Sequence, residues 1–314
     1  VANSCYQIGL VCEQQGSYGE SIKYLKMCLR LREQVLGKQH PDVAASYYSL
    51  GNVYEAQGNY NQALQYYQSG LRLQVATLGE HHPNVADSYN DIGALYATQE
   101  DDAQALASFQ KALQIYLKIH GDQPHPDVAD SYNNIGNVYA KQGDYVQALD
   151  HSQKALEIYL KIHGEYHVNV AKNHHNIGNI YLIEGKYTQS LAYYQKALQI
   201  YSKVYNYRPH PDIASSYYGV GIVYKQMGDS SKALAYLAQS LELQAAIYGA
   251  QSHPDTAHSL HQMGLIYKDY KNYPQALRYL EQAFFTWRAC LGELHPNTQA
   301  VYSDLEEIRQ KIQH

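Results

Sequence analysis

Asparagine side chains recur along this chain within segments that otherwise have the pattern of amphipathic helices. Asparagine forms helices poorly, so its repetition inside a helix calls for a reason. A carboxamide both donates and accepts hydrogen bonds, and the backbone of an extended peptide needs both. We predict that these side chains contact a bound peptide; the alternative is that they bond only solvent or the adjacent helix. The residues are Asn52, Asn90, Asn133, Asn134, Asn137, Asn176 and Asn179.

Other polar side chains in the same segments extend this candidate peptide-binding site. They are Tyr48, Lys141, His175, Tyr218, Lys225 and His261. Tyrosine is enriched at binding hot spots, so Tyr48 and Tyr218 are candidate anchors, with packing as the alternative. Charge changes sign along the chain, from Glu13, Glu55, Asp87, Asp91 and Asp130 to Lys141, Lys172, Lys225 and Lys268. This order indicates either ordinary solvated charge or a peptide whose basic part faces the early repeats and whose acidic part faces the late ones.

The sequence gives little support for catalysis or a metal. It has no phosphate-binding loop, nucleophile elbow or paired carboxylates at a turn, so we predict no enzyme, no catalytic residue and no cofactor. Cys5, Cys12 and Cys28 occupy positions that other repeats fill with core residues, which predicts reduced core thiols, with a metal or redox site as the alternative. His258 and His261 share a helical face, but no third metal ligand lies near them in the sequence, so we predict no metal site there. His174 takes the place of an inward-facing tyrosine, which predicts a core histidine.

The candidate binding residues lie within a sequence repeat that extends over all 314 residues. A glycine returns every 42 or 43 residues, at Gly9, Gly51, Gly93, Gly136, Gly178, Gly221 and Gly264. A junction histidine returns with it, at His40, His82, His125, His167, His210, His253 and His295, and proline follows each except His167. Each unit holds two amphipathic helical runs around a polar break, and such a hairpin must stack on its copies to bury its apolar face.

The expected fold is therefore an all-α solenoid of seven helix-turn-helix repeats with a C-terminal capping helix. The repeats span about 1–39, 40–81, 82–124, 125–166, 167–209, 210–252 and 253–294, the cap spans 295–314, and 1–314 form one domain. Proline fits the first position of each first helix. The recurrent glycine predicts close approach of the second helix. The turns contain glycine except at Glu100 and Lys271, so repeats three and seven are expected to have looser or differently shaped turns.

Composition narrows the classes of partner. A net charge of −5 and a pI near 6.3 argue against a nucleic-acid scaffold. No apolar run is long enough to cross a membrane and no signal peptide opens the chain, which predicts a cytoplasmic protein. Val1 is expected to begin within a helix, as in a piece of a longer protein. The uncovered first repeat predicts self-association.

The repeat resembles the tetratricopeptide repeat, as Tyr89, Ile92-Gly93, Tyr96, Ala105, Phe109 and Ala112 illustrate. The 42-residue unit and the segments GEHHPNVA (79–86) and YNNIGNVY (132–139) are similar to the kinesin light chain subclass. This resemblance implies a right-handed superhelix whose concave groove binds short peptides, with first-helix asparagines bonding the peptide backbone. Kinesin light chains read tryptophan-acidic motifs with basic early repeats. The early repeats here are acidic, which counts against that cargo.

Two functions remain open at this point. The first is a non-catalytic scaffold or adaptor that binds a linear peptide or a partner helix in its groove. The alternative is a regulatory or sensor domain of a larger signalling or effector protein, with the groove occupied intramolecularly or by a folded partner. In either case we expect the binding residues on the first helices. They should lie three positions before, one position after, and four or five positions after each repeat glycine.

Overall fold

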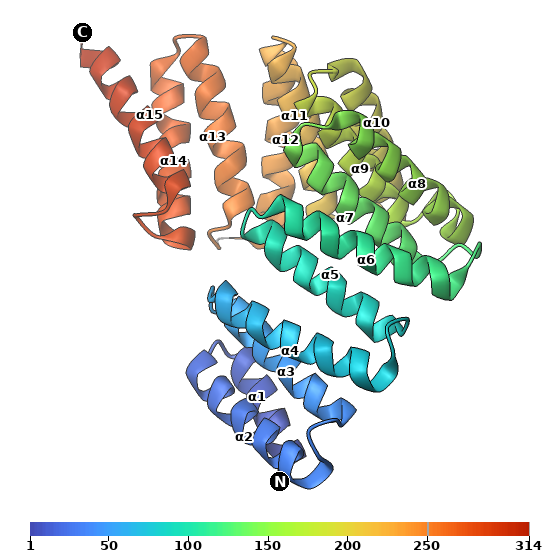
Figure 1. Ribbon diagram of the computed structural model, residues 1–314. Helices are drawn as coiled ribbons and strands as arrows, with labels where there is room; N and C mark the ends of the chain where they lie inside the picture. The colour runs from blue at the N-terminus through green and yellow to red at the C-terminus, as the bar shows by residue number, and fades with distance from the viewer. Residues whose placement is uncertain (250, 314) are drawn as a thin grey trace. The chain divides into compact units, whose positions relative to one another are not determined.

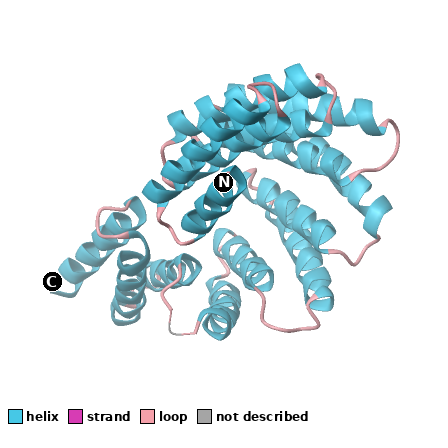
Figure 2. Ribbon diagram, turned by 90° about the horizontal axis from the view of Figure 1, so that it is seen from below, coloured by secondary structure: helices cyan, strands magenta, loops and turns pink. Residues whose placement is uncertain are grey.

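The computed structural model describes residues 1–249 and 251–313, and within these ranges the chain is entirely helices and loops (Figures 1 and 2). Fifteen helices are present in the described ranges, which confirms the predicted all-α class and the seven helix pairs followed by a final helix. Their bounds are α1 Ala2–Gln14, α2 Tyr18–Leu36, α3 Pro41–Ala56, α4 Tyr60–Leu78, α5 Pro83–Thr98, α6 Asp102–His120, α7 Pro126–Gln142, α8 Tyr145–His163, α9 Val168–Ile183, α10 Tyr187–Val204, α11 Pro211–Gln226, α12 Ser230–Tyr248, α13 Pro254–Asp269, α14 Tyr273–Leu291 and α15 Pro296–Gln313.

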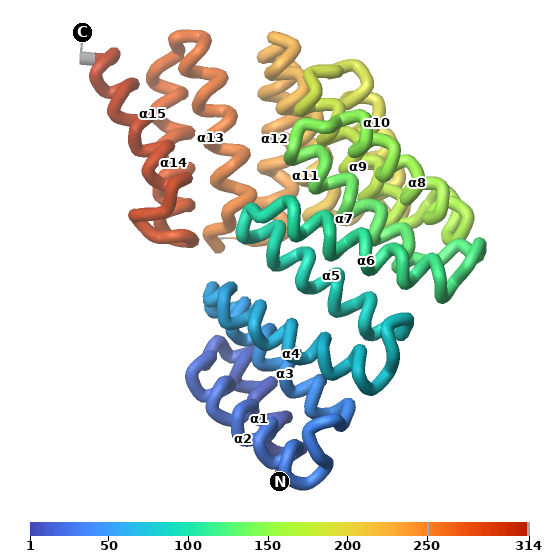
Figure 3. Tube along the Cα trace, viewed as in Figure 1, coloured from blue at the N-terminus to red at the C-terminus, as the bar shows by residue number. Residues whose placement is uncertain are grey.

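Contacts divide the chain into two units, Val1–Ile158 and Tyr159–His314, which we call the N-terminal and C-terminal units. In the N-terminal unit α1 packs on α2, α3 on α4 and α5 on α6, and each pair also contacts the next first helix. The C-terminal unit repeats this with α9 on α10, α11 on α12 and α13 on α14, followed by α15 on α14. Figure 3 shows each pair as an antiparallel hairpin.

Every described junction histidine starts a first helix in the same way. Its Nδ1 accepts a hydrogen bond from the backbone N–H two residues later, as His40 does from Asp42 at 3.1 Å and His210 from Asp212 at 3.2 Å. Proline follows every junction histidine except His167, within the first helical turn, where its missing N–H costs no hydrogen bond. The predicted helix starts are therefore confirmed, and the histidine is identified as the N-cap.

The turns of repeats three and seven correct one prediction. Glu100 and Lys271 adopt φ of 62° and 58°, the left-handed conformation that glycine has in the other turns, such as Gly143 at 82°. The next backbone N–H then bonds the same carbonyl position: Asp101 N to Tyr96 O and Asn272 N to Tyr267 O are both 2.9 Å. The expected looser turns are wrong, because tight packing of the two helices maintains the turn despite the strain of a Cβ atom.

The repeated glycines in the first helices allow close contact with the second helix, as predicted. A Cβ atom on Gly51 would lie 2.4 Å from the ring of Tyr67, and one on Gly264 would lie 2.7 Å from Leu280. Around these contacts, rows of buried apolar side chains form the core of each unit, for example the cluster around Phe109 in the N-terminal unit. The glycines thus have a packing role.

Helix α15 covers the last hairpin with one apolar face. Leu305 and Ile308 are buried against α14, while Ile312 is 49% exposed and lies outside the covered part. Cys5, Cys12 and Cys28 are buried free thiols, which confirms their predicted core positions, and His174 is also buried. None of the helices in the described ranges combines the length and apolarity needed to span a membrane.

Candidate functional site

The solvent-facing side of the first helices is the candidate site, and we call it the first-helix surface in each unit. Every predicted site residue lies on a first helix. Residues three positions before the repeat glycine are half-buried, namely Tyr48, Asn90, Asn133, His175, Tyr218 and His261. Asn52 and Asn137, one position after the glycine, are exposed. The residues three positions before the glycine are therefore partly covered by neighbouring side chains, whereas Asn52 and Asn137 face solvent.

In the N-terminal unit, a tyrosine of the second helix is bonded to the first-helix surface. The Tyr67 hydroxyl lies 2.7 Å from Asn52 Oδ1 and 2.6 Å from Glu55 Oε2. Tyr48 stacks on Tyr67 with 5.7 Å between ring centroids, and its hydroxyl donates to Gln74 Oε1 at 3.4 Å. Tyr48 is thus held by packing against the second helix. The Asn52 carbonyl and the Glu55 carboxylate are both within hydrogen-bond distance of the single Tyr67 hydroxyl proton.

The same asparagine–tyrosine pair occurs in the C-terminal unit, where the Tyr194 hydroxyl donates to Asn179 Oδ1. Where the second helix carries an apolar residue, the first-helix partner is apolar too. These pairs are Leu10 with Leu25, Ala94 with Phe109, Ile222 with Leu237 and Leu265 with Leu280. A spacing of 15 residues connects the partners, and it was visible in the sequence. Part of the asparagine pattern thus comes from pairing between the two helices.

Other asparagines have no such partner. Among the described residues, Asn134, Asn137 and Asn176 make no side-chain hydrogen bond, and Asn137 is exposed. Asn90 differs, because its Oδ1 is buried without a hydrogen-bond partner. The three amides are therefore available to a ligand, whereas Asn52 and Asn179 have their carbonyl oxygens bonded and their amino groups left to donate.

The predicted basic residues mostly have partners within the chain. Lys141 forms an ion pair with Asp102 at 3.1 Å. Lys225 donates to Gln262 Oε1 at 2.7 Å, and burial lowers the pKa of its ammonium group. Because Lys141 and Lys225 already have partners within the chain, they are weaker candidates for binding an acidic ligand than the sequence indicates.

Helix α15 contacts the first-helix surface of repeat seven. Asp304 lies 2.9 Å from His261 Nε2 and 3.1 Å from Lys268 Nζ, and Glu307 lies 2.6 Å from Lys268 Nζ. The rings of His258 and His261 meet Trp287 edge-on, at 4.9 and 5.3 Å. In the described part of the chain, these two histidines do not join a group of three ligand atoms, and neither do the three buried cysteines.

Three shallow pockets lie on the first-helix surface, one in the N-terminal unit and two in the C-terminal unit. The first, of about 220 Å³, is lined by Tyr48, Asn52, Gln74, Asn84, Asp87, Ser88 and Asp91. The second, of about 190 Å³, is lined by Lys172, His175, Asn176, Tyr201, Asp212 and Ser215. The third, of about 240 Å³, is lined by Ser215, Tyr218, Gln244, Asp255 and His258.

The pocket floors contain residues that the sequence analysis missed. Each comes from the second helix, 23 positions after the repeat glycine: Gln74, Tyr201 and Gln244. Tyr201 and Gln244 are buried and Gln74 is half-buried, so their pattern looks like that of core positions. The mixture of Gln and Tyr in a buried column was the signal that could have identified them.

Carboxylates dominate the electrostatics of the N-terminal pocket. The Tyr116 hydroxyl donates to Asp87, and the Tyr67 hydroxyl bonds Glu55. Burial, reinforced by the negative charges of Asp87 and Glu55, raises the pKa of the Asp91 carboxyl to about 6. This pocket attracts cations at neutral pH and loses part of its charge as the pH falls below 6.

In the C-terminal unit, two imidazoles lie next to each other on α9, of which His175 lines a pocket and His174 is buried in the core. His175 meets Tyr194 edge-on at 5.0 Å, and its Nδ1 is 3.5 Å from Ser216 Oγ. Burial lowers the pKa of both His174 and His175 to about 4. Both rings are therefore neutral at pH 7, while Lys172 beside His175 is exposed.

The tetratricopeptide repeat profile matches residues 1–74, 70–118, 127–203, 170–246 and 212–284, and the chain belongs to that family. Among solved structures it is similar to BtubC (BKLC) from P. vanneervenii, with 22% identity, a TM-score of 0.61, and coverage of 76% of this chain and 92% of that one. A putative kinesin light chain repeat protein from Podosopora anserina shares 19% identity, with a TM-score of 0.58 over 65% of this chain and 96% of that one. These two confirm the similarity to kinesin light chain-like repeats at the level of the fold.

A Rap protein solved in complex with Competence and Sporulation Factor shares 15% identity, with a TM-score of 0.59 over 91% of this chain and 80% of that one. A search of curated proteins finds no significant match. The comparisons therefore define a protein-interaction fold, and no catalytic domain is found among them.

Proposed function

We propose that this chain is a non-catalytic peptide receptor that binds an extended segment of a partner protein along the first-helix surface. The observation that carries the proposal is the set of unpaired amides, Asn134 and Asn137 in the N-terminal unit and Asn176 in the C-terminal unit. An extended backbone exposes alternating donors and acceptors, and a carboxamide can satisfy one of each.

The pockets support binding of side chains beside that backbone. In the N-terminal unit, Asp87 and Asp91 line one pocket, and Glu55 adds to its negative charge. We expect a lysine or arginine of the partner there, because charge complementarity favours the correct partner and the rate of association. In the C-terminal unit, the pocket beside Lys172 takes a residue that accepts hydrogen bonds.

Intramolecular pairing limits the available surface at repeat seven. Asp304 and Glu307 of α15 already bond His261 and Lys268, so a partner would have to displace them. The same contacts support a second candidate function, that of a regulatory domain. In that function, other segments of the same protein occupy the first-helix surface. The Rap complex is consistent with the capacity of this fold to hold a partner.

The test is a peptide-display selection on the whole 314-residue chain, followed by affinity measurement on an Asn134→Ala/Asn137→Ala variant. We expect enriched peptides with basic residues and a loss of affinity in the variant of about 1 to 3 kcal/mol, the cost of leaving ligand groups unpaired. The matched control is Gln153→Ala, an exposed amide on the second helix of the same repeat. Equal binding by all three proteins would place the site elsewhere, and absence of any enrichment would argue for a folded partner.

A further inference from the structure

Four successive repeat junctions contain an aromatic ring stacked on the junction histidine. The ring comes from the last turn of a second helix or the residue after it. The centroid distances are 3.5 Å for His120 on His125, 3.7 Å for His163 on His167, 3.5 Å for Tyr205 on His210 and 3.7 Å for Tyr248 on His253. The shared geometry makes these junctions internal controls for one another.

The two tyrosine junctions have a hydrogen bond that the histidine junctions lack. The Tyr205 hydroxyl donates to Asp212 Oδ2 at 2.7 Å, and the Tyr248 hydroxyl donates to Asp255 Oδ2 at 3.1 Å. In each case a phenol proton lies between the stacked ring and the carboxylate that follows the junction histidine. This proton completes the polar contacts of the junction.

At the His120 junction the stacked ring makes no hydrogen bond of this kind to the carboxylate among the described residues. His120 Nε2 is buried without a hydrogen-bond partner. Asp127 Oδ2 lies 3.3 Å from His125 Nδ1, but that nitrogen accepts the backbone N–H of Asp127 at the helix start, so it has no proton to donate to the carboxylate. The junction therefore contains a buried imidazole nitrogen without a hydrogen-bond partner and a carboxylate that receives no proton from the stacked ring.

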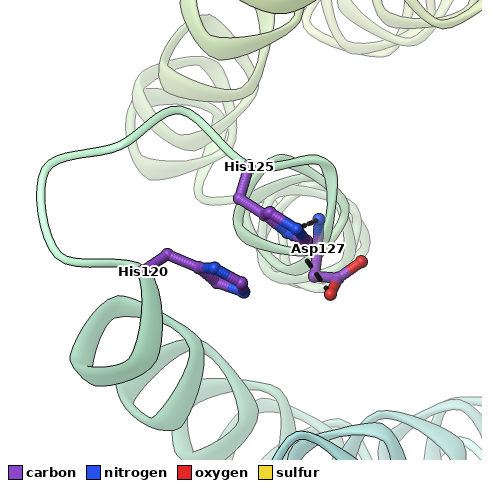
Figure 4. Close-up of side chains that lie close together, drawn as sticks. All are labelled: His120, His125 and Asp127. Atoms are coloured by element: carbon purple, nitrogen blue, oxygen red, sulfur yellow. Dashed lines mark hydrogen bonds and ion pairs between the residues drawn. The ribbon is translucent and has the colours of Figure 1, made fainter.

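One nitrogen from each imidazole and one Asp127 oxygen lie within 4.8 Å of one another, a combination that no other group of described residues achieves (Figure 4). We propose that His120, His125 and Asp127 form a binding site for a divalent transition metal ion, with Zn²⁺ as the best match. The ion would bind the Asp127 carboxylate, just as the Tyr205 hydroxyl binds Asp212 and the Tyr248 hydroxyl binds Asp255 at the later junctions. This inference is independent of the peptide-binding function.

The ligand types favour zinc or a neighbouring transition metal over calcium or magnesium. Two neutral imidazoles and a carboxylate are typical ligands of Zn²⁺, Co²⁺, Ni²⁺ and Cu²⁺, whereas Ca²⁺ and Mg²⁺ prefer oxygen ligands alone. All three residues are half-buried, so water can complete the coordination. The two rings stack nearly parallel, at 9°, so one of them must rotate for both ring nitrogens to reach a single ion. If His125 ligates through Nδ1, the metal also replaces its helix-capping hydrogen bond.

Metal binding would connect the end of α6 to the start of α7. His120 is the last residue of α6, and Asp127 lies in the first turn of α7. The ion would bridge the loop between them and stiffen the junction between repeats three and four. The effect is confined to the N-terminal unit.

The experiment is isothermal titration of ZnCl₂ into the full 314-residue chain after removal of metals with EDTA, with the thiols kept reduced. We expect one ion per chain and a rise in melting temperature on zinc binding. Two substitutions convert the site into arrangements that the chain already uses: His120→Tyr recreates Tyr205/His210/Asp212, and Asp127→Asn recreates His163/His167/Asn169. Both should fold, and each should weaken zinc binding roughly tenfold or more, since even the loss of an outer-shell partner costs that much.

His163→Tyr is the matched control and should leave zinc binding unchanged. Co²⁺ absorption identifies the ligands, because binding without a sulfur-to-metal charge-transfer band excludes the four cysteines. The proposal is overturned if no zinc binds, if a charge-transfer band appears, or if His120→Tyr binds zinc as tightly as the parent chain.

Discussion

The first-helix surfaces of the two units share one repeat plan but differ in the chemistry of their polar groups. In the N-terminal unit, phenol hydroxyls of Tyr67 and Tyr116 bond the carboxylates of Glu55 and Asp87. In the C-terminal unit, the ring of His175 lines a pocket and is kept neutral by burial. At the position six residues before the repeat glycine, for example, the N-terminal unit has Asp87 and the C-terminal unit has Lys172, so this column changes from an acidic to a basic side chain. The comparison shows that substitutions in a few columns of the repeat change the surface while the packing is kept.

The close approach at the repeat glycine differs between Gly51 of the N-terminal unit and Gly178 of the C-terminal unit, and it gives the largest expected effect. Gly51→Ala would place a Cβ atom 2.4 Å from Tyr67, whereas Gly178→Ala would place one 3.1 Å from Tyr194. Overpacking of this kind costs about 3 kcal/mol at the tighter site and about 1 at the looser one. The better helix propensity of alanine returns about 1 kcal/mol in both. We therefore expect Gly51→Ala to lose about 2 kcal/mol of unfolding free energy and Gly178→Ala to be near neutral.

Urea unfolding followed by circular dichroism measures both variants. Gly19→Ala is the control, because Gly19 lies in a helix with no atom within 4 Å of the added Cβ, and it should stabilise the chain slightly. A similar loss at Gly51 and Gly178 would mean that the second helix approaches these two glycines equally closely, contrary to the structure.

The C-terminal unit should lose stability in acid through His174. Its native pKa of about 4 is below the ordinary 6.5, so the unfolded chain takes up the proton first as the pH falls. The stability is complete above pH 6.5 and is lost progressively down to pH 4. At pH 5 the loss from His174 is about 2 kcal/mol, at 1.36 kcal/mol per unit of pKa difference. Urea unfolding at pH 7 and pH 5, followed by fluorescence of Trp287 in the same unit, measures it.

His174→Tyr provides the variant that tests the cause. Tyrosine occupies the same position in repeats two, three, four and six, at Tyr47, Tyr89, Tyr132 and Tyr217. Both ring nitrogens of His174 are buried without hydrogen-bond partners, so the substitution should also raise stability at pH 7 by about 1 kcal/mol. An unchanged acid response in this variant would assign the effect to other groups. The Asp91 carboxyl of the N-terminal unit has a raised pKa and contributes in the opposite direction.

The strained turns should respond alike in both units, which makes them a control for the comparison. Glu100→Gly in the N-terminal unit and Lys271→Gly in the C-terminal unit each remove a Cβ atom from a left-handed backbone conformation. Each should raise the melting temperature, with a gain of about 1 kcal/mol. Gly143→Ala introduces the same strain and should cost a similar amount. If only one glycine substitution stabilises the chain, the two turns are not equivalent.

These turns also show which features of the fold can be predicted from the sequence and which cannot. The helix pairs, the capped starts and the close glycine contacts follow from local rules that repeat in every unit. The conformation of Glu100 and Lys271 does not, because their own preference opposes it and only the packing of the neighbouring helices maintains it. Tertiary contacts override the local preference at these two positions.

The candidate site was predictable in its location but not in its partners. All of the predicted residues lie on first helices, since helical spacing determines which residues share a face. Their hydrogen bonds depend on residues 15 or more positions away, as with Asn52 and Tyr67 or Lys268 and Asp304. The binding roles of the thirteen residues therefore stay predictions, and the unpaired amides at Asn134, Asn137 and Asn176 are the strongest of them.

The smallest expected effect, a pH-dependent affinity, tests the acidic surface of the N-terminal unit directly. A basic peptide bound there should lose affinity between pH 7 and pH 5, because the Asp91 carboxyl, with a pKa of about 6, takes up a proton and no longer attracts a cation. One ion pair of this kind contributes about 0.5 kcal/mol, or roughly a twofold change.

Asp91→Asn should bind with the lower affinity at both pH values. Asp150→Asn, which removes a carboxylate paired with Lys154 on α8, should keep the full pH dependence. A pH dependence that survives in Asp91→Asn would mean that a different group of the N-terminal unit titrates on binding.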